Sequence, residues 1–244
     1  MSLAESSKSW KGPAGSNSRR DSPGLETQKW RLGRLQEARL YFVCEGRPHN
    51  QDPSQLLDVA LRGGVDLVQL REKTARSDDE LVALAKPFRR AADAHGALFL
   101  LNDRPDLVER CGADGVHVGQ DDMPVAEARA LVGPGALVGL STHSPEQFDS
   151  ALVARGNARS HQVSAGPVWE TPTKEGRPAA GLELIEHAAA SGAEVPWFAI
   201  GGIDLSNVDE VTGAGASRIV VVRAIRDAAD PEAAARELRA RLGV

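Results

Sequence analysis

Cysteine is scarce in this chain of 244 residues, with only Cys44 and Cys111 present. A disulfide framework is therefore not expected, and a reducing cytoplasm is the predicted location. No stretch approaches the roughly 18 apolar residues that a membrane-spanning helix needs, so no membrane association is expected. Residues 1–37 lack an apolar central run, and no signal peptide is visible in them.

An excess of basic residues is also missing. Lys and Arg number 29 against 34 Asp and Glu, for a formal net charge of −5. This balance argues against a mainly electrostatic nucleic-acid binder. It still allows a local basic pocket for a phosphorylated small molecule, which is the class of partner we expect. The sequence leaves open whether the chain forms a homo-oligomer.

Several catalytic patterns are absent as well. The sequence has no His–Glu–His or Cys–x–x–Cys arrangement that would indicate zinc. It has no G-x-S-x-G nucleophile elbow. No G-x-G-x-x-G turn follows the first apolar run, as a dinucleotide-binding sheet would require. Covalent catalysis by a side-chain nucleophile is therefore not indicated.

Residues 1–37 differ in composition from the rest of the chain. They are rich in Ser, Gly, Pro and charge. Such a segment buries too little apolar surface to offset its ordering entropy, so the sequence predicts a disordered tail. Residues 38–244 remain as one catalytic domain.

Short apolar runs recur from about residue 38 onward. Runs of this kind are typical of strands buried on both faces of a parallel sheet. The runs are 40–44, 65–70, 97–101, 115–118, 136–140, 161–165, 195–200 and 217–222. Most of the segments between them have helical spacing, as in 77–96, which begins with a Ser–Asp cap and ends on Gly.

Eight strands that alternate with helices predict a single (β/α)₈ TIM barrel in the α/β class. A doubly wound open sheet is the rival fold. Polar residues follow many of the strands rather than gathering at one switch point, which favours the barrel.

The active site of such a barrel lies where the strands end, so the residues that follow each strand are the candidates. They combine cations, carboxylates, hydroxyls and a glycine pair, as a polyphosphate with Mg²⁺ requires. The candidates are Gln69 to Lys73, Asn102 and Asp103, Asp121 and Asp122, Ser141, Gly166 to Lys174, Gly201 and Gly202, and Val222 with Arg223.

Each piece alone has a plainer explanation. Asp103 is also a suitable cap for the helix that follows, and Arg71 to Lys73 is also a typical surface charge cluster. Thr171 to Thr173 is also compatible with a simple turn. His117 lies inside a strand, and we favour a packed structural histidine over a ligand.

Taken together and in order, these segments resemble the thiamine-phosphate synthase family. The resemblance covers residues 38 to 226, and its most specific motifs are GVHVGQDDMP and TPTKEG. The other motifs are VQLREK, LNDRPDLV, GLSTHSPEQ, AIGGI and VVRAI.

The resemblance implies a (β/α)₈ barrel that joins hydroxymethylpyrimidine pyrophosphate to a thiazole phosphate, giving thiamine phosphate and pyrophosphate with one Mg²⁺ ion. It implies that Asp103 and Asp122 bind the metal, and that Arg71, Lys73 and Ser141 are catalytic. The implied pyrimidine pyrophosphate site is Gln69, Leu70, Arg71, Glu72, Lys73, Asn102, Ser141 and Lys174. The implied thiazole phosphate site is Thr171, Pro172, Thr173, Gly202, Val222 and Arg223.

One segment departs from the family pattern. Residues 156–165 are more polar than a buried sixth strand is expected to be, which predicts weaker closure of the barrel or a local shift. The alternatives are a thiazole tautomerase-like barrel, which needs no Mg²⁺, and a non-catalytic thiazole-phosphate-binding protein. Another phosphate-binding isomerase barrel would explain Gly201 and Gly202 but not TPTKEG.

Overall fold

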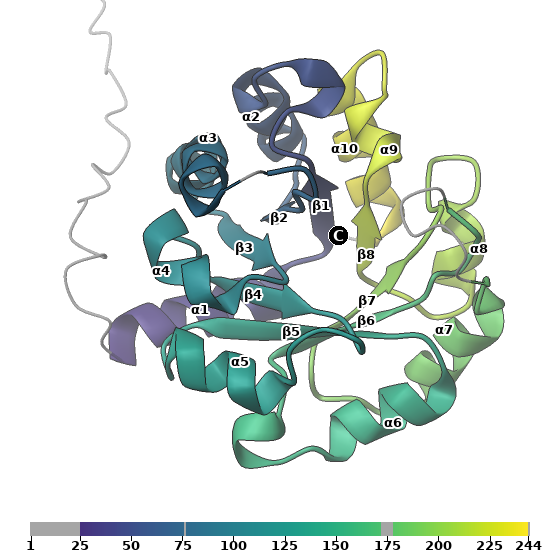
Figure 1. The fold of residues 1–244 in the computed structure, drawn as a ribbon. Coiled ribbons are helices and arrows are strands. Elements are labelled where there is room, and N and C mark those ends of the chain that lie inside the picture. Colours follow the sequence, from purple (N-terminus) through teal and green to yellow (C-terminus); the bar gives the residue numbers. More distant parts are fainter. Residues whose placement is uncertain (1–24, 76, 172–177, 244) are drawn as a thin grey trace, which may run out of the picture.

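Eight parallel strands close into a barrel in the computed structural model, which describes residues 25–75, 77–171 and 178–243 (Figure 1). Each strand pairs with the next along the chain, and the last pairs with the first. The strands are β1 (Leu40–Cys44), β2 (Leu67–Leu70), β3 (Leu98–Asn102), β4 (Gly115–Val118), β5 (Leu137–Thr142), β6 (Gln162–Ala165), β7 (Trp197–Ile200) and β8 (Ile219–Val221). The predicted (β/α)₈ barrel is confirmed.

Helices surround the strands (Figure 1). They are α1 (Leu25–Glu37), α2 (Ser54–Arg62), α3 (Asp78–His95), α4 (Val108–Cys111), α5 (Val125–Val132), α6 (Pro145–Val153), α7 (Gly181–Ala190), α8 (Val208–Gly213), α9 (Arg223–Arg226) and α10 (Pro231–Arg241). The predicted caps of α3 are present: the Ser77 hydroxyl accepts from the Glu80 N–H, and Gly96 ends the helix with φ 64°. Within the described residues, no helix has both the length and the apolar character to cross a membrane.

Helix α1 corrects the expectation of a disordered segment over 1–37. Its Leu35 is fully buried among the side chains that fill the barrel. Arg31 donates to the Asp114 carboxylate and to the Gly135 carbonyl, and Gln28 donates to the Pro134 carbonyl. These partners precede β4 and β5, so α1 caps the end of the barrel where the strands begin. Composition missed the helix because its stability comes from these long-range contacts; residues 1–24 lie outside the described residues.

Alternating side chains along each strand divide the interior into two cores. Outward-facing side chains pack under the helices, as Phe42, Val68 and Phe99 do. Inward-facing side chains such as Leu67, Leu98 and Phe198 fill the closed end of the barrel. At the open end, polar side chains such as Gln69 and Ser141 lie beside apolar ones such as Val43.

The sixth strand closes the barrel in spite of its polarity. β6 pairs with β5 on one side and with β7 on the other. Its polar residues Gln162 and Ser164 are buried. They lie on the inward-facing row, while Val163 packs in the outer core. The expectation of weakened closure is wrong, because Gln162 has a polar partner inside the barrel, the His117 ring.

Candidate active site

Three cavities open where the strands end, and Arg71 lines all of them. Arg71 follows β2 directly, and its N–H donates to the Cys44 carbonyl at the end of β1. This bond fixes the backbone from which the guanidinium extends. We name the three spaces the central, acidic and arginine cavities.

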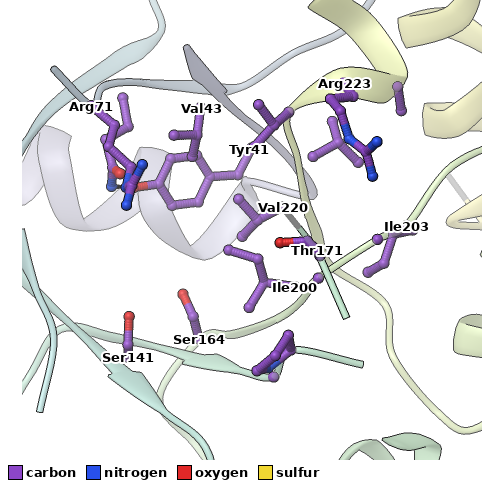
Figure 2. Close-up of a pocket in the computed structure, with 18 of the residues that line it drawn as sticks. Tyr41, Val43, Arg71, Ser141, Ser164, Thr171, Ile200, Ile203, Val220 and Arg223 are labelled. Carbon is purple, nitrogen blue, oxygen red and sulfur yellow. Dashed lines mark hydrogen bonds between the residues drawn. The ribbon is translucent and has the colours of Figure 1, made fainter. Parts of the chain in front are cut away.

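The central cavity, of about 290 Å³, occupies the mouth of the barrel (Figure 2). Apolar side chains such as Val43, Ile200 and Val220 form much of its wall. Figure 2 shows Arg71 and Arg223 on opposite sides of this wall. The cavity can therefore hold flat, apolar rings between two separate cations. The predicted site residues that line it are Gln69, Arg71, Asn102, Ser141, Thr171, Gly202, Val222 and Arg223.

Arg71 and Arg223 differ from most arginines of the chain. Among the described residues, neither guanidinium has an ion-pair or side-chain hydrogen-bond partner. Arg226, close by, is instead bound to Glu45 and Asp227. Two uncompensated guanidinium groups beside one cavity can each bind a phosphate by bidentate hydrogen bonds.

The acidic cavity, of about 300 Å³, brings together the two predicted metal ligands Asp103 and Asp122. Lys73, Asn102 and Ser141 line it as well. The Asp122 carboxylate accepts from the Gly119 N–H at 2.8 Å, which fixes its orientation. Asp103 forms an ion pair with Lys73. Loops after β2, β3 and β4 therefore converge as the sequence predicts.

Asp103 has a left-handed backbone, with φ 58°. Asp tolerates this region better than most residues, at a cost of about 1–2 kcal/mol. Its N–H donates to the His117 carbonyl at 2.9 Å, which holds the turn in place. Strained backbone conformations of this kind cluster at functional sites.

The acidic cavity fits a magnesium ion that is shared with a substrate. In the described residues, no group of three or more His, Cys, Asp or Glu side chains could hold a metal ion unaided. Two carboxylates on one cavity are nevertheless the usual protein contribution to Mg²⁺, with phosphate oxygens and water completing the octahedron. Asp103 and Asp122 line the same cavity and are the carboxylates that fit this role.

The arginine cavity, of about 470 Å³, lies between the loops after β1 and β2. Glu72 lines it and accepts hydrogen bonds from Thr74 and from the Gly46 N–H. Burial raises the pKa of Glu72, but these hydrogen bonds outweigh burial and hold it below the usual range. Glu72 is therefore ionised, and its hydrogen bond to the Gly46 N–H joins the loop after β2 to the loop after β1.

Glycines shape the loop after β7. Gly202 has φ 73°, and a Cβ added there would meet the Trp169 Cβ at 3.0 Å. Its carbonyl accepts from the Asn207 side chain at 2.9 Å. This backbone conformation favours glycine, and Gly202 lines the central cavity.

A buried polar network under the central cavity was not predicted from the sequence. Gln69 donates to the Tyr41 hydroxyl, and burial raises the pKa of Tyr41 strongly, so the phenol stays protonated. Gln162 donates to His117 Nδ1 at 3.1 Å, and His117 Nε2 lies 2.9 Å from the Ser141 hydroxyl. With the Gln162 amide as donor to Nδ1, a neutral His117 ring carries its proton on Nε2 and donates a hydrogen bond to the Ser141 oxygen.

His117 is thus a packed strand histidine, as predicted, but it also lines the central and acidic cavities. Its partners come from β5 and β6, in the row His117, Gly139, Gln162. Only the strand register reveals this network, and no local motif in the sequence marks it.

Not every predicted residue reaches these cavities. Leu70 is fully buried in the outer core, since its neighbours Gln69 and Arg71 face inward. Only its backbone is available to a ligand. Pro172, Thr173 and Lys174 lie outside the described residues.

Comparison with known proteins covers most of the chain. Residues 40–225 match the family model described as thiamine monophosphate synthase. The thiamine-phosphate synthase of Acidothermus cellulolyticus is 49% identical over 208 residues, which cover 85% of this chain and 96% of that protein. The thiamine-phosphate synthase of Thermus thermophilus is 52% identical over 206 residues, covering 84% and 97%.

Solved structures agree with these sequence matches. The thiamine phosphate pyrophosphorylase of Pyrococcus furiosus superposes with a TM-score of 0.74 at 29% identity, over 85% of this chain and 96% of that one. A 3-hexulose-6-phosphate synthase superposes with a TM-score of 0.55 at 22% identity, which reflects the shared barrel alone.

Proposed function

The chain belongs to the thiamine monophosphate synthase family and is a transferase that forms thiamine phosphate; we propose that it does so from two phosphorylated substrates. The first is 4-amino-2-methyl-5-hydroxymethylpyrimidine diphosphate, and the second is a thiazole phosphate. Inorganic diphosphate is the other product. The observation that carries this proposal is the position of Arg71 at the junction of the three cavities.

Two guanidinium groups, Arg71 and Arg223, which have no side-chain partner in the described part of the chain, support two separate phosphate sites. In the proposal, the Arg71 side of the mouth binds the pyrimidine diphosphate, with Leu70 contributing only its backbone. The residues of this site are Gln69, Leu70, Arg71, Glu72, Lys73, Asn102, Ser141 and Lys174. The Arg223 side binds the thiazole phosphate through Thr171, Pro172, Thr173, Gly202, Val222 and Arg223.

Asp103 and Asp122 are the proposed ligands of one Mg²⁺ ion. When bound, the ion neutralises negative charge on the diphosphate oxygens and so improves the leaving group. Arg71 and Lys73 also line the acidic cavity. The two carboxylates and the two cations are therefore placed around one diphosphate group.

Bond cleavage in this site needs charge stabilisation rather than a nucleophile. The bond between the pyrimidine methylene carbon and the diphosphate oxygen breaks, and its electron pair leaves with the diphosphate. Arg71 and Lys73 stabilise that developing charge. The methylene cation that remains is stabilised by electron donation from the ring amino group.

Bond formation completes the reaction without a proton transfer. The lone pair of the thiazole nitrogen forms the new C–N bond at the methylene carbon. The apolar wall of the central cavity, which includes Val43 and Ile200, holds the two rings together and excludes water from the cation. Ser141, oriented by His117, supplies a hydroxyl to the pyrimidine side.

Residues 38–244 form the proposed catalytic domain, with α1 as its cap. We also propose a cytoplasmic location, which the low cysteine content supports.

Diphosphate release and thiamine phosphate formation, measured with both substrates and increasing Mg²⁺, test the proposal. The wild type should require Mg²⁺ and both substrates. Asp103→Asn and Asp122→Asn should lower the rate at limiting Mg²⁺ on the order of 10²-fold while melting like the wild type.

Asp209→Asn is the charge control, since Asp209 pairs with Arg241 and lines none of the three cavities. Undiminished turnover in both cavity variants would refute the metal assignment. Binding of thiazole phosphate without any diphosphate release would instead indicate a non-catalytic barrel, and isomerisation of the thiazole without Mg²⁺ would indicate a tautomerase.

A further inference from the structure

Two cross-loop ion pairs join the loops that follow β2 and β3. Lys73, after β2, pairs with Asp103, after β3. In the opposite sense, Asp78, at the start of α3, pairs with Arg104, the neighbour of Asp103. Each loop therefore supplies one cation and one carboxylate, and we call these four residues the double clamp.

Arg104 is the most firmly held member of the double clamp. Its Nη2 donates to Asp78 Oδ1 at 2.7 Å and to Asp106 Oδ2 at 2.7 Å. Its Nε donates to Asp106 Oδ1 at 2.9 Å. Two nitrogens of the guanidinium thus donate to the two oxygens of the Asp106 carboxylate. These hydrogen bonds hold the pKa of Asp106 below its usual range. Such fork-to-fork pairing fixes direction as well as distance.

Arg104 does not belong to the walls of the three cavities, so substrate contact does not explain its partners. Its neighbour Asp103 has the left-handed backbone described above. The N–H of Asp103 is held by the His117 carbonyl. On the other side, one peptide bond joins Asp103 to the clamped Arg104. Both ends of the strained residue are therefore anchored.

Asp78 extends the same constraint to the second loop. It lies in the first turn of α3, after Ser77 has capped that helix. Lys73 precedes this turn by a few residues and reaches back to Asp103. The start of α3 is thus joined to the loop after β3 by the Asp78–Arg104 pair, and the loop after β2 is joined to it by the Lys73–Asp103 pair.

We propose that Arg104 is a positioning residue, whose bonds to Asp78 and Asp106 orient the Asp103 carboxylate toward the Mg²⁺–diphosphate group. The inference rests on the proposed function of Asp103 as a metal ligand. Outer partners of metal ligands are commonly worth about 10- to 100-fold in metal affinity. The side chains of Asp78, Arg104 and Asp106 are 51%, 38% and 46% exposed, so the contribution of their ion pairs to folding stability is small.

The test measures Mn²⁺ affinity in the presence of inorganic diphosphate, by electron paramagnetic resonance, beside the Mg²⁺ dependence of turnover. Arg104→Ala and Asp78→Asn should each weaken Mn²⁺ binding on the order of 10-fold. The Mg²⁺ concentration for half-maximal rate should rise in parallel, and the double variant should add little. Arg104→Lys keeps the positive charge but loses the bidentate hydrogen bonds, so the Mn²⁺ affinity of this variant should lie between those of the wild type and Arg104→Ala.

Arg110→Ala is the matched control, because Arg110 binds the exposed Asp79 at 2.6 Å, lies at the limit of ion-pair distance from Asp78 at 3.9 Å, and is not adjacent to Asp103. Its Mn²⁺ affinity should equal that of the wild type. If Asp103→Asn loses Mn²⁺ binding while Arg104→Ala, Arg104→Lys and Asp78→Asn all bind like Arg110→Ala, the positioning role is wrong and the metal site stands. If Asp103→Asn also binds Mn²⁺ normally, the proposed metal site fails, and the positioning role fails with it.

Discussion

Gly139 lies in β5 between two polar side chains that meet over it. The register places His117 on one side and Gln162 on the other. A Cβ added at Gly139 would lie 2.4 Å from Gln162 Nε2 and 2.5 Å from His117 Nδ1. Ordinary contacts begin near 3.4 Å, so Gly139→Ala forces both groups to move by roughly 1 Å.

The expected loss of stability in Gly139→Ala has two contributions. Overpacking a dense interior costs about 1–3 kcal/mol. Separating Gln162 from His117 while both stay buried adds about 1–3 kcal/mol. We therefore expect Gly139→Ala to lose about 2–6 kcal/mol of unfolding free energy. His117 would also release Ser141, and kcat/KM should fall about 10-fold, equivalent to about 1.4 kcal/mol.

Urea unfolding followed by circular dichroism measures the first effect, and steady-state kinetics measures the second. Gly135→Ala is the matched control, because a Cβ at Gly135, just before the same strand, meets nothing within 4 Å. Its stability and activity should match the wild type. Equal unfolding midpoints for Gly139→Ala and Gly135→Ala would refute the packing of this network.

Two further predictions concern stability. Burial lowers the pKa of His161 from 6.5 to about 4, and its Nδ1 accepts from the Val138 N–H as a neutral ring. The unfolded chain binds the extra proton below pH 6.5, so lowering the pH from 7 to 5 should remove about 2 kcal/mol of stability. His161→Asn, compared with the wild type by urea unfolding at both pH values, should not show this pH-dependent loss of stability. An equal loss of stability between pH 7 and pH 5 in the two proteins would contradict the role of His161. Leu35→Ala should cost about 2–5 kcal/mol if α1 caps the barrel, whereas an unchanged melting temperature would show that α1 contributes nothing.

The convergence of the site was predictable from the sequence. Parallel strands in a barrel deliver the residues that follow them to one end, so Arg71, Asp103 and Asp122 could be placed together without coordinates. Leu70 could have been separated from its neighbours by the same alternation rule, because residues on either side of an inward-facing position point outward.

Other features depend on partners distant in the sequence. Helix α1 is stabilised by loops about a hundred residues away, as the bond from Arg31 to Gly135 shows. The polar character of Gln162 made β6 look unsuitable for a buried strand, yet its partner His117 is 45 residues away. Such pairings follow from the strand register, which no local pattern specifies.

The steady-state rate of diphosphate release tests the role of Arg71 most directly. Arg71→Ala, measured with both substrates and saturating Mg²⁺, should lower kcat on the order of 10²-fold, because a donor to the leaving group is lost in the transition state. Arg90→Ala, at an exposed position of α3 that lines none of the three cavities, is the arginine control and should release diphosphate at the wild-type rate. A rise in KM with unaltered kcat would show that Arg71 binds the ground state and the transition state equally, and would contradict its role in the departure of diphosphate.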